Sequence, residues 1–395
     1  MSSSSKMEAP PASMKTENAT SPGSSFVTYA HTIAFTPFIL TRFGFDVACC
    51  LLPSTRPSKE HSFEQAVRLR FLKLVLLYCS ILRAGPKLTL RSGREGNRFE
   101  VIRPQSQEVY QGPLSDNEIR PEPIGITWTP EPPSDVSTGS EPIVVVHIHG
   151  GAFVVGDGRD SDTGFLAKTL IRRMGCTHVC TPQYRLSGDK EGRFPAALQD
   201  ALTAYLHLIK EKGILAKQII LSGDSAGANI ALGLLRYIHE HGKELDIPAP
   251  RAVALWSPWV DVAAAVKGDL RDYPNYSTDY LTKEFGQWGA HAVSGYGAID
   301  LDGPYLSPAH HPFKMEADVP MFVQGGDKEL IWESIEIMAS GFKEVGWSNI
   351  KLKVSENCPH DILLVGPVVG FREEAKVAAT EAREFFLATT DLKLV

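Results

Sequence analysis

The stretch QIILSGDSAGANIALGLL, residues 218–235, decides the fold of this chain. A short apolar run ends at a Gly-x-Ser-x-Gly turn centred on Ser225, and a pattern typical of a helix follows the turn. Small residues must flank Ser225 because such a turn is tight, and the glycines at 223 and 227 allow the strand and the helix to approach closely. This order is typical of a nucleophile elbow, so the sequence predicts that the Ser225 side chain projects from the top of a sheet.

Strand patterns alternate with helix patterns on both sides of the elbow. Strands are expected over residues 124–128, 143–148, 177–181, 218–222, 252–256, 321–324 and 350–354, and helices over residues 196–212, 228–235, 331–345 and 368–388. The continuous β-branched run at 143–148 is typical of a parallel strand that is covered on both faces. The alternation predicts an α/β fold with a mostly parallel, doubly wound sheet.

Composition and charge place the chain among globular proteins. Its 395 residues include 40 basic and 46 acidic side chains, and 43% of the residues are hydrophobic. A net charge of −6 gives no basic surface of the kind that binds nucleic acid, so no nucleic-acid partner is expected. The six cysteines form no Cys-x-x-Cys pair, which indicates no metal site and favours a reducing compartment. We therefore expect a cytoplasmic protein.

Three segments divide the chain. Residues 1–25 are rich in Ser, Pro and Ala and are expected to be a disordered tail, without the pattern of a signal peptide. Residues 26–120 are expected to form an apolar helical cap region. Residues 121–395 are expected to form the catalytic domain, with a cap insertion at about 263–313.

The N-terminal region combines apolar and basic side chains. Residues 26–52 are largely aromatic and aliphatic, but their charge-free run is too short to span a membrane as a helix. Residues 63–83 have the pattern of a helix on which Arg68, Arg70 and Lys73 form a basic face. That face is either solvated or lies near anionic lipid headgroups. A peripheral contact with an endomembrane or a lipid droplet is therefore one of the expectations.

A serine hydroxyl is a weak nucleophile near neutral pH, so Ser225 needs a base and a third group that orients the base. Among the histidines that follow Ser225, only His360 lies in the loop after the last predicted strand, where it can reach the carboxyl edge of the sheet. The acid is expected after the strand at 321–324, where Asp327 and Glu329 are both candidates. Asp327 is the commoner residue type for this role, and the residues themselves leave the choice open.

Backbone N–H groups near the nucleophile can stabilise an oxyanion. We expect them from Gly150 and Gly151, which lack side chains and allow close approach, and from Ala226, which follows the nucleophile. His149 is expected to brace this loop through a hydrogen bond. His147, in contrast, is expected to be a core histidine on its strand.

Six motifs occur in order between residues 123 and 390: His149-Gly150-Gly151-Ala152, Tyr184-Arg185-Leu186, Phe194-Pro195-Ala196, Gly223-Asp224-Ser225-Ala226-Gly227-Ala228-Asn229, Ser257-Pro258-Trp259-Val260-Asp261 and Pro359-His360-Asp361. Together they resemble the hormone-sensitive-lipase-like family of α/β-hydrolases, which includes fungal-type carboxylesterases and steryl ester hydrolases. The resemblance implies the α/β-hydrolase fold, carboxylic ester hydrolysis, a helical cap made partly from the N-terminal region, and neither a cofactor nor a metal. In the family the acid lies nine residues after a proline that opens its strand. Pro320 is that proline here, so the resemblance selects Glu329.

We therefore expect a serine esterase that forms an acyl-enzyme on its nucleophile. Residues 26–95, with part of 263–313, are expected to form an apolar cap over Ser225, which predicts a bulky apolar substrate such as a sterol, lipid or secondary-metabolite ester. Two alternatives remain: an acyltransferase that uses the same triad, and a small-molecule receptor on a catalytically dead hydrolase fold. Receptors that resemble this family lack the histidine, whereas this chain keeps Ser225, Glu329 and His360.

Overall fold

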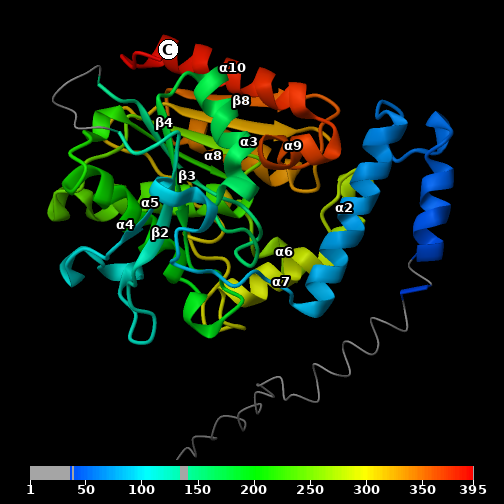
Figure 1. Cartoon of the computed structure of the whole chain (residues 1–395), viewed down its shortest axis with the longest axis horizontal. Coiled ribbons are helices and arrows are strands. Elements are labelled where there is room, and N and C mark those ends of the chain that lie inside the picture. Colours follow the sequence, from blue (N-terminus) through cyan, green and yellow to red (C-terminus); the bar gives the residue numbers. More distant parts are fainter. Residues whose placement is uncertain (1–35, 38–39, 134–140, 395) are drawn as a thin grey trace, which may run out of the picture.

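The computed structural model describes residues 36–37, 40–133 and 141–394, and Figure 1 shows a twisted sheet with helices on both faces. The strands are β1 (Phe99–Ile102), β2 (Ile124–Thr129), β3 (Val144–Ile148), β4 (His178–Gln183), β5 (Ile219–Asp224), β6 (Ala252–Trp256), β7 (Met321–Gly326) and β8 (Ile350–Ser355). The α-helices are α2 (Phe63–Leu82), α3 (Asp160–Thr169), α4 (Ala196–Lys210), α5 (Ser225–Leu245), α6 (Ala264–Lys267), α7 (Lys283–Val293), α8 (Trp332–Glu344), α9 (Ile362–Val369) and α10 (Arg372–Thr389).

Short helical turns join many of these elements. They lie at Pro53–Thr55, Gly93–Arg98, Gln107–Val109, Gly112–Leu114, Leu170–Met174, Lys190–Gly192, Ala216–Gln218, Leu270–Asp272, Pro274–Tyr276 and Pro308–His310. The helix expected over residues 368–388 corresponds to α10, and α9 precedes it as a separate helix that the sequence did not predict. Gly370 separates them because its φ of +88° is left-handed and cannot continue a right-handed helix.

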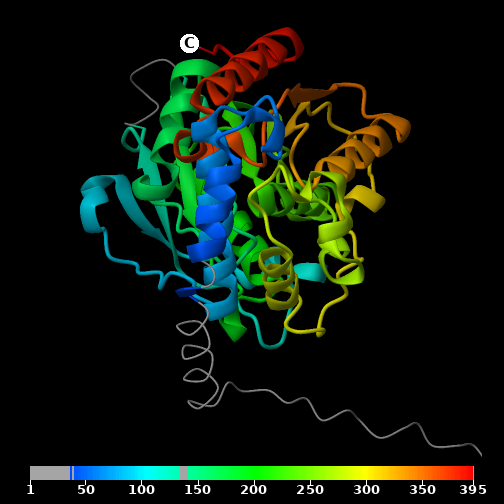
Figure 2. The same ribbon diagram turned by 90° about the vertical axis from the view of Figure 1, so that its right-hand side faces the viewer.

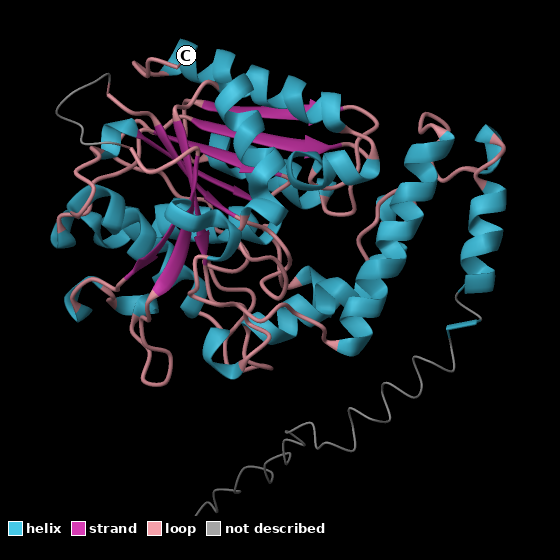
Figure 3. Ribbon diagram, in the orientation of Figure 1, coloured by secondary structure: helices cyan, strands magenta, loops and turns pink. Residues whose placement is uncertain are grey.

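Within the described ranges, the strand order in the sheet is β1-β2-β4-β3-β5-β6-β7-β8. Strand β2 is antiparallel to its neighbours β1 and β4, and the other pairs are parallel. The expected α/β-hydrolase architecture with a mostly parallel, doubly wound sheet is confirmed, and Figure 3 shows the strands between two helical layers. Because the parallel strands share a direction, the loops that follow β3, β5, β7 and β8 meet at one edge of the sheet.

Alternate side chains of the central strands face two separate cores. In β3, Val144 and Val146 pack with residues of α4 and α5, whereas Val145 packs with residues of α3 and α10. The register between β3 and β5 places Val145 opposite Ile220, which belongs to the same core as Val145. Both faces of the sheet are therefore covered, and the β-branched run that suggested a buried parallel strand lies at its centre.

The sheet begins earlier in the chain than the expected domain boundary at residue 121. Strand β1 falls within the predicted cap region of residues 26–120, and it pairs with β2 so that Phe99 lies opposite Thr127. This short strand satisfies the backbone groups on the outer edge of β2. Four residues are too few to give a recognisable strand pattern, which explains why the sequence did not predict it.

The N-terminal helices lie on the outside of the molecule. Helix α2 begins at a capping box formed by Ser62 and Gln65 and packs on α7 and α9 (Figure 1). Figure 2 shows the N-terminal helices in blue on the face toward the viewer. Residues 40–49 are helical as well, and the Phe43 ring lies 6.1 Å from the Phe71 ring of α2. No helix in the described ranges is both long and apolar enough to cross a membrane. The expected tail of residues 1–25 lies outside the described residues.

Candidate active site

Ser225 stands at the junction of β5 and α5 with a left-handed φ of +49°. A Cβ atom on Gly223 would lie 2.4 Å from the carbonyl oxygen of Gly227, and one on Gly227 would lie 2.0 Å from that of Ile148. Both positions therefore exclude any larger residue. Ser225 is the first residue of α5, and the N–H groups in the first turn of a helix have no partner within the helix.

Three side chains from three loops form one chain of hydrogen bonds. The His360 Nε2 atom lies 2.8 Å from Ser225 Oγ, and His360 Nδ1 lies 2.7 Å from Glu329 Oε2. The Asp327 carboxylate is instead paired with Lys328 Nζ at 3.2 Å. Of the two acids that the residues left open, Glu329 is thus the one placed against the histidine.

The protonation state of His360 suits a general base. Burial lowers the pKa of the imidazole below its ordinary value, while the carboxylates of Asp279 and Asp361 oppose this shift. The ring is therefore neutral near pH 7. Its Nε2 atom can then accept the Ser225 proton when Nδ1 carries the hydrogen that faces Glu329.

The second oxygen of Glu329 is also held. Its Oε1 atom accepts the Gly326 N–H and, at 3.2 Å, the Ser257 hydroxyl; the Ser257 oxygen in turn accepts the Asp361 N–H at 2.9 Å. Burial raises the pKa of Glu329, and the hydrogen bonds from Gly326 and Ser257 favour its ionised form. The sequence assigned no role to Ser257, although it lies in one of the quoted motifs, because its partners come from distant loops.

The oxyanion loop requires one correction. The Gly150 N–H donates to Asp224 Oδ2 at 2.8 Å, so this group is not available to an oxyanion as expected. Residue 150 is glycine for steric reasons, because a Cβ atom would lie 2.3 Å from the same carboxylate oxygen. Gly151 and Ala152 have left-handed φ angles of +103° and +51°, and their amides make no hydrogen bond within the described ranges. With Ala226 in the first turn of α5, they are the free donors beside the nucleophile.

The two histidines of this region are both buried, with different partners. His149 Nδ1 lies 2.8 Å from the Gly150 carbonyl oxygen, and its ring stacks on Tyr184 at 4.3 Å, so the expected brace on the loop is present. His147 lies within hydrogen-bond distance of Ser222 Oγ and Asp224 Oδ1, at 2.9 and 2.8 Å. Burial lowers the pKa of His149 to about 4 and that of His147 to about 3, so both rings are neutral.

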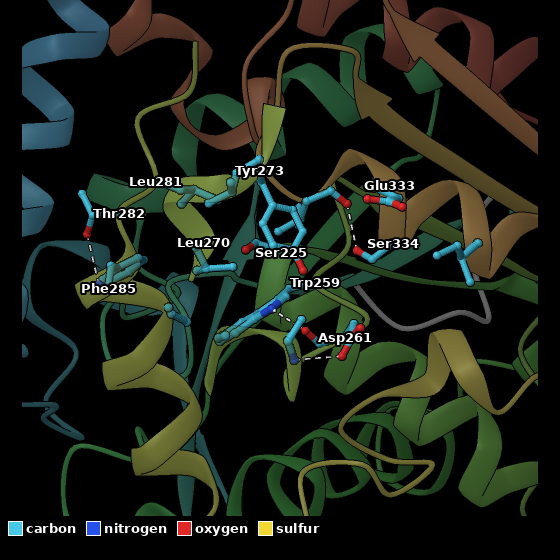
Figure 4. A pocket seen from close by; sticks show the side chains of 17 residues that line it. Ser225, Trp259, Asp261, Leu270, Tyr273, Leu281, Thr282, Phe285, Glu333 and Ser334 are labelled. Carbon is cyan, nitrogen blue, oxygen red and sulfur yellow. Dashed lines mark hydrogen bonds between the residues drawn. The ribbon is translucent and has the colours of Figure 1, made fainter. Parts of the chain in front are cut away.

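A cavity of about 180 Å³ lies beside Ser225, and Figure 4 shows the side chains around it. Its lining comes from the oxyanion loop, the start of α5, the loops after β6 and β7, the cap insertion and α8: Ala152, Ser225, Trp259, Asp261, Ala264, Ala265, Leu270, Tyr273, Leu281, Thr282, Phe285, Gly286, Leu330, Ile331, Glu333, Ser334 and Ile337. Apolar groups predominate, and the charged members are acidic.

The expected contribution of residues 26–95 to the cap over Ser225 is not found for the described part of that region. None of its described residues lines the cavity; α2 packs on α7, whose Phe285 and Gly286 are among the lining residues. Eight of the 17 residues that line the cavity come from the predicted insertion at 263–313. In the described part of the chain, no group of three or more His, Cys, Asp or Glu residues is arranged to hold a metal ion.

Comparisons with curated proteins place the chain among hydrolases. A family model described as alpha/beta hydrolase fold matches residues 145–364, more than half of the chain. An acetyl-hydrolase of Streptomyces hygroscopicus is 27% identical over 203 residues, 51% of this chain and 62% of that protein. The carboxylesterase/phospholipase LipF of Mycobacterium tuberculosis is 33% identical over 138 residues, 35% of this chain and 33% of that protein. The chain spans less than two thirds of the length of either relative.

Solved structures share the fold at low sequence identity. A hyperthermophilic esterase from the archaeon Pyrobaculum calidifontis aligns with a TM-score of 0.56 and 21% identity over 85% of this chain and 94% of that chain. An esterase from the bacterial hormone-sensitive lipase family aligns with a TM-score of 0.54 and 22% identity over 80% of this chain and 97% of that chain. At these identities the likeness concerns the fold.

Proposed function

Since this chain belongs to the alpha/beta hydrolase fold family, we propose that it is a serine carboxylic ester hydrolase. Ser225 is the nucleophile, His360 the general base and Glu329 the acid that orients the base. The observation that carries the proposal is the unbroken chain of hydrogen bonds through these three side chains, beside a largely apolar cavity. The similarity to an acetyl-hydrolase and a carboxylesterase supports the same reaction class.

The reaction has two halves. His360 takes the proton of Ser225 while Oγ attacks the ester carbonyl, and the N–H groups of Gly151, Ala152 and Ala226 bind the oxyanion that forms. Protonated His360 then gives its proton to the leaving alcohol, which leaves an acyl group on the serine. A water molecule activated by His360 hydrolyses this acyl-enzyme and restores the free hydroxyl.

The proposed substrate is a bulky apolar ester, such as a sterol, lipid or secondary-metabolite ester. Support comes from the side chains of Leu270, Leu281, Phe285 and Ile331 around the cavity, since pockets bind apolar ligands through surfaces of this kind. An apolar substrate is thus supported by the cap insertion and α8, and not by the N-terminal helices as expected. The name of the Streptomyces relative favours a short acyl group, with the bulk of the substrate in its alcohol.

The proposed location is the cytoplasm, at the surface of an endomembrane or lipid droplet. Side chains of the N-terminal region support this contact: Leu40, Phe45, Leu51 and Leu52 are 58% to 64% exposed. On α2, Phe71 and Val75 are exposed as well. Monomeric proteins rarely expose a contiguous apolar patch of large area unless it binds a partner or a membrane.

A panel of p-nitrophenyl esters of increasing chain length, together with steryl acetates and long-chain steryl esters, tests the proposed function. We expect hydrolysis of apolar esters by the intact protein and none above background by Ser225→Ala. Faster hydrolysis of small polar esters than of any apolar ester would contradict the substrate class. Acyl transfer to an added alcohol in place of hydrolysis would identify an acyltransferase. Absence of fluorophosphonate labelling at Ser225 would point to a receptor.

A further inference from the structure

The acid and the base lie on separate loops, after β7 and β8, and a segment of the cap insertion binds the loop of the acid. We call this segment, residues 275–280, the triad clamp. Asn275 Nδ2 and Thr278 Oγ1 donate to the three consecutive backbone carbonyl groups of residues 327–329, at 2.9 to 3.1 Å. The loop that carries the acid is therefore held by the clamp through its own backbone.

Asp279 in the clamp joins this loop to the loop of the base. Its Oδ2 atom accepts the Leu330 N–H at 2.7 Å, and its Oδ1 atom accepts the N–H groups of Tyr280 at 2.7 Å and His360 at 3.2 Å. The side chain is buried. A carboxylate suits this place because all three neighbours are donors, whereas an amide would direct its own N–H group at one of them.

Lys73 of α2 holds the clamp from the opposite side. This lysine was expected on a solvated or lipid-facing basic surface, but its Nζ atom donates to the carbonyl groups of Tyr276 and, at 3.0 Å, Asp279. Nζ also lies 3.9 Å from the centroid of the Tyr276 ring, a cation–π contact. Arg70, on the same helix, makes no hydrogen bond within the described ranges and offers a matched control.

The charges around Asp279 are mixed. Burial raises the pKa of Asp279, and Glu329 adds to this shift, whereas His360, the Leu330 N–H and Lys73 favour the ionised carboxylate. Burial lowers the pKa of Lys73 to about 8, with Asp279 and Glu284 opposing the shift and Arg70 adding to it. The carboxylates of Asp279 and Asp361, the latter from the loop of the base, both favour the imidazolium.

We propose that Asp279 is a positioning residue of the triad, which holds the loops of Glu329 and His360 in fixed positions relative to each other. Lys73 acts on the triad through Asp279. The inference rests on the proposed ester hydrolysis. It gives the N-terminal helical region a role outside the cavity: α2 supports the catalytic loops from behind instead of contacting the substrate.

The variant Asp279→Asn tests the role directly. With the best p-nitrophenyl ester, we expect kcat to fall about 10- to 100-fold with KM nearly unchanged, because a small displacement of the base misaligns it with Ser225. The acid limb of kcat/KM should also move to lower pH, since loss of a negative neighbour lowers the pKa of His360. A structural role alone would leave that limb in place, so an unchanged kcat or an unchanged pH profile overturns the inference.

Lys73→Met and Arg70→Met form the matched pair on α2. We expect kcat to fall about threefold to tenfold in Lys73→Met, the net scale of one typical intramolecular hydrogen bond, and to stay unchanged in Arg70→Met. Equal kcat values for the two variants would refute the proposal that Lys73 acts on the triad through Asp279. If Asp279→Asn fails to fold by circular dichroism, this pair decides the inference. Full activity of Ser225→Ala would refute the proposed function itself, whereas an inactive Ser225→Ala beside an unaffected Asp279→Asn would refute only the positioning role.

Discussion

Replacing Glu329 with glutamine tests whether this residue is the acid of the triad, because the change replaces one carboxylate oxygen with an NH₂ group. Glu329 Oε1 accepts the Gly326 N–H and the Ser257 hydroxyl, and Oε2 lies 2.7 Å from His360 Nδ1. The backbone N–H can only donate, so it holds the amide oxygen of a glutamine at the Oε1 position and turns the NH₂ group towards Nδ1. Because that NH₂ group donates too, His360 must carry its proton on Nε2, where it cannot accept the proton of Ser225.

The expected loss follows from this inverted tautomer. The equivalent Asp-to-Asn change in a serine protease lowers kcat about 10⁴-fold, or about 5.4 kcal/mol at roughly 1.36 kcal/mol per factor of ten. We expect Glu329→Gln to lose a comparable amount. Asp327→Asn is the matched control, because its carboxylate is partly exposed and pairs with Lys328, a contact worth about 0–1 kcal/mol. Its kcat should stay close to that of the wild type.

The assay is steady-state hydrolysis of the p-nitrophenyl ester that the wild type prefers, with thermal unfolding by circular dichroism as the control for folding. Both variants should unfold as a single transition near that of the wild type. A crippled Asp327→Asn beside a nearly normal Glu329→Gln would refute the assignment of the acid. A Glu329→Gln variant that keeps more than about a tenth of the wild-type kcat would refute the tautomer argument, since that argument predicts a loss near 10⁴-fold.

Other measurements probe the nucleophile, the pH dependence, the oxyanion loop and the exposed apolar surface. Ser225→Ala should lower kcat on the order of 10⁶-fold in the same assay, and a variant that kept a tenth of the activity would contradict the mechanism. Burial lowers the pKa of His360 below 6.5, so kcat/KM should stay constant down to a pH below 6.5 and fall at lower pH as the imidazole becomes protonated. A fall in kcat/KM with its midpoint above pH 6.5 would contradict this prediction. Gly150→Ala should reduce both kcat and the melting temperature, since its Cβ atom would lie 2.3 Å from Asp224 Oδ2, whereas Gly188→Ala, with nothing within 4 Å, should change neither. The double variant Phe45→Ser with Leu52→Ser should cosediment less with vesicles of phosphatidylcholine and phosphatidylserine than the wild type does. The control Leu215→Ser, at an exposed site outside the N-terminal helices, should bind the vesicles as the wild type does. Equal binding by all variants would show that the N-terminal apolar surface does not contact the membrane.

The sequence by itself determined the architecture and indicated two members of the proposed triad. Strand and helix patterns alternate along the chain, and this periodicity depends only on which side chains face the core, so it survives in the sequence. Ser225 and His360 could be predicted because each follows a recognisable strand, and the carboxyl ends of parallel strands meet at one edge. Glu329 could be chosen over Asp327 only from the spacing of a family motif, because the positions of the two residues alone favoured neither carboxylate.

Only the tertiary structure decided which polar groups meet. Gly150 donates to Asp224 across 74 residues, and the Lys73 ammonium reaches the Asp279 backbone across 206 residues. Side chains in loops follow no period, so their directions depend on the path of the chain and on partners from distant segments. For the same reason the apolar N-terminal region could not be assigned to the cavity or to the surface until the packing of α2 on α7 and α9 was known.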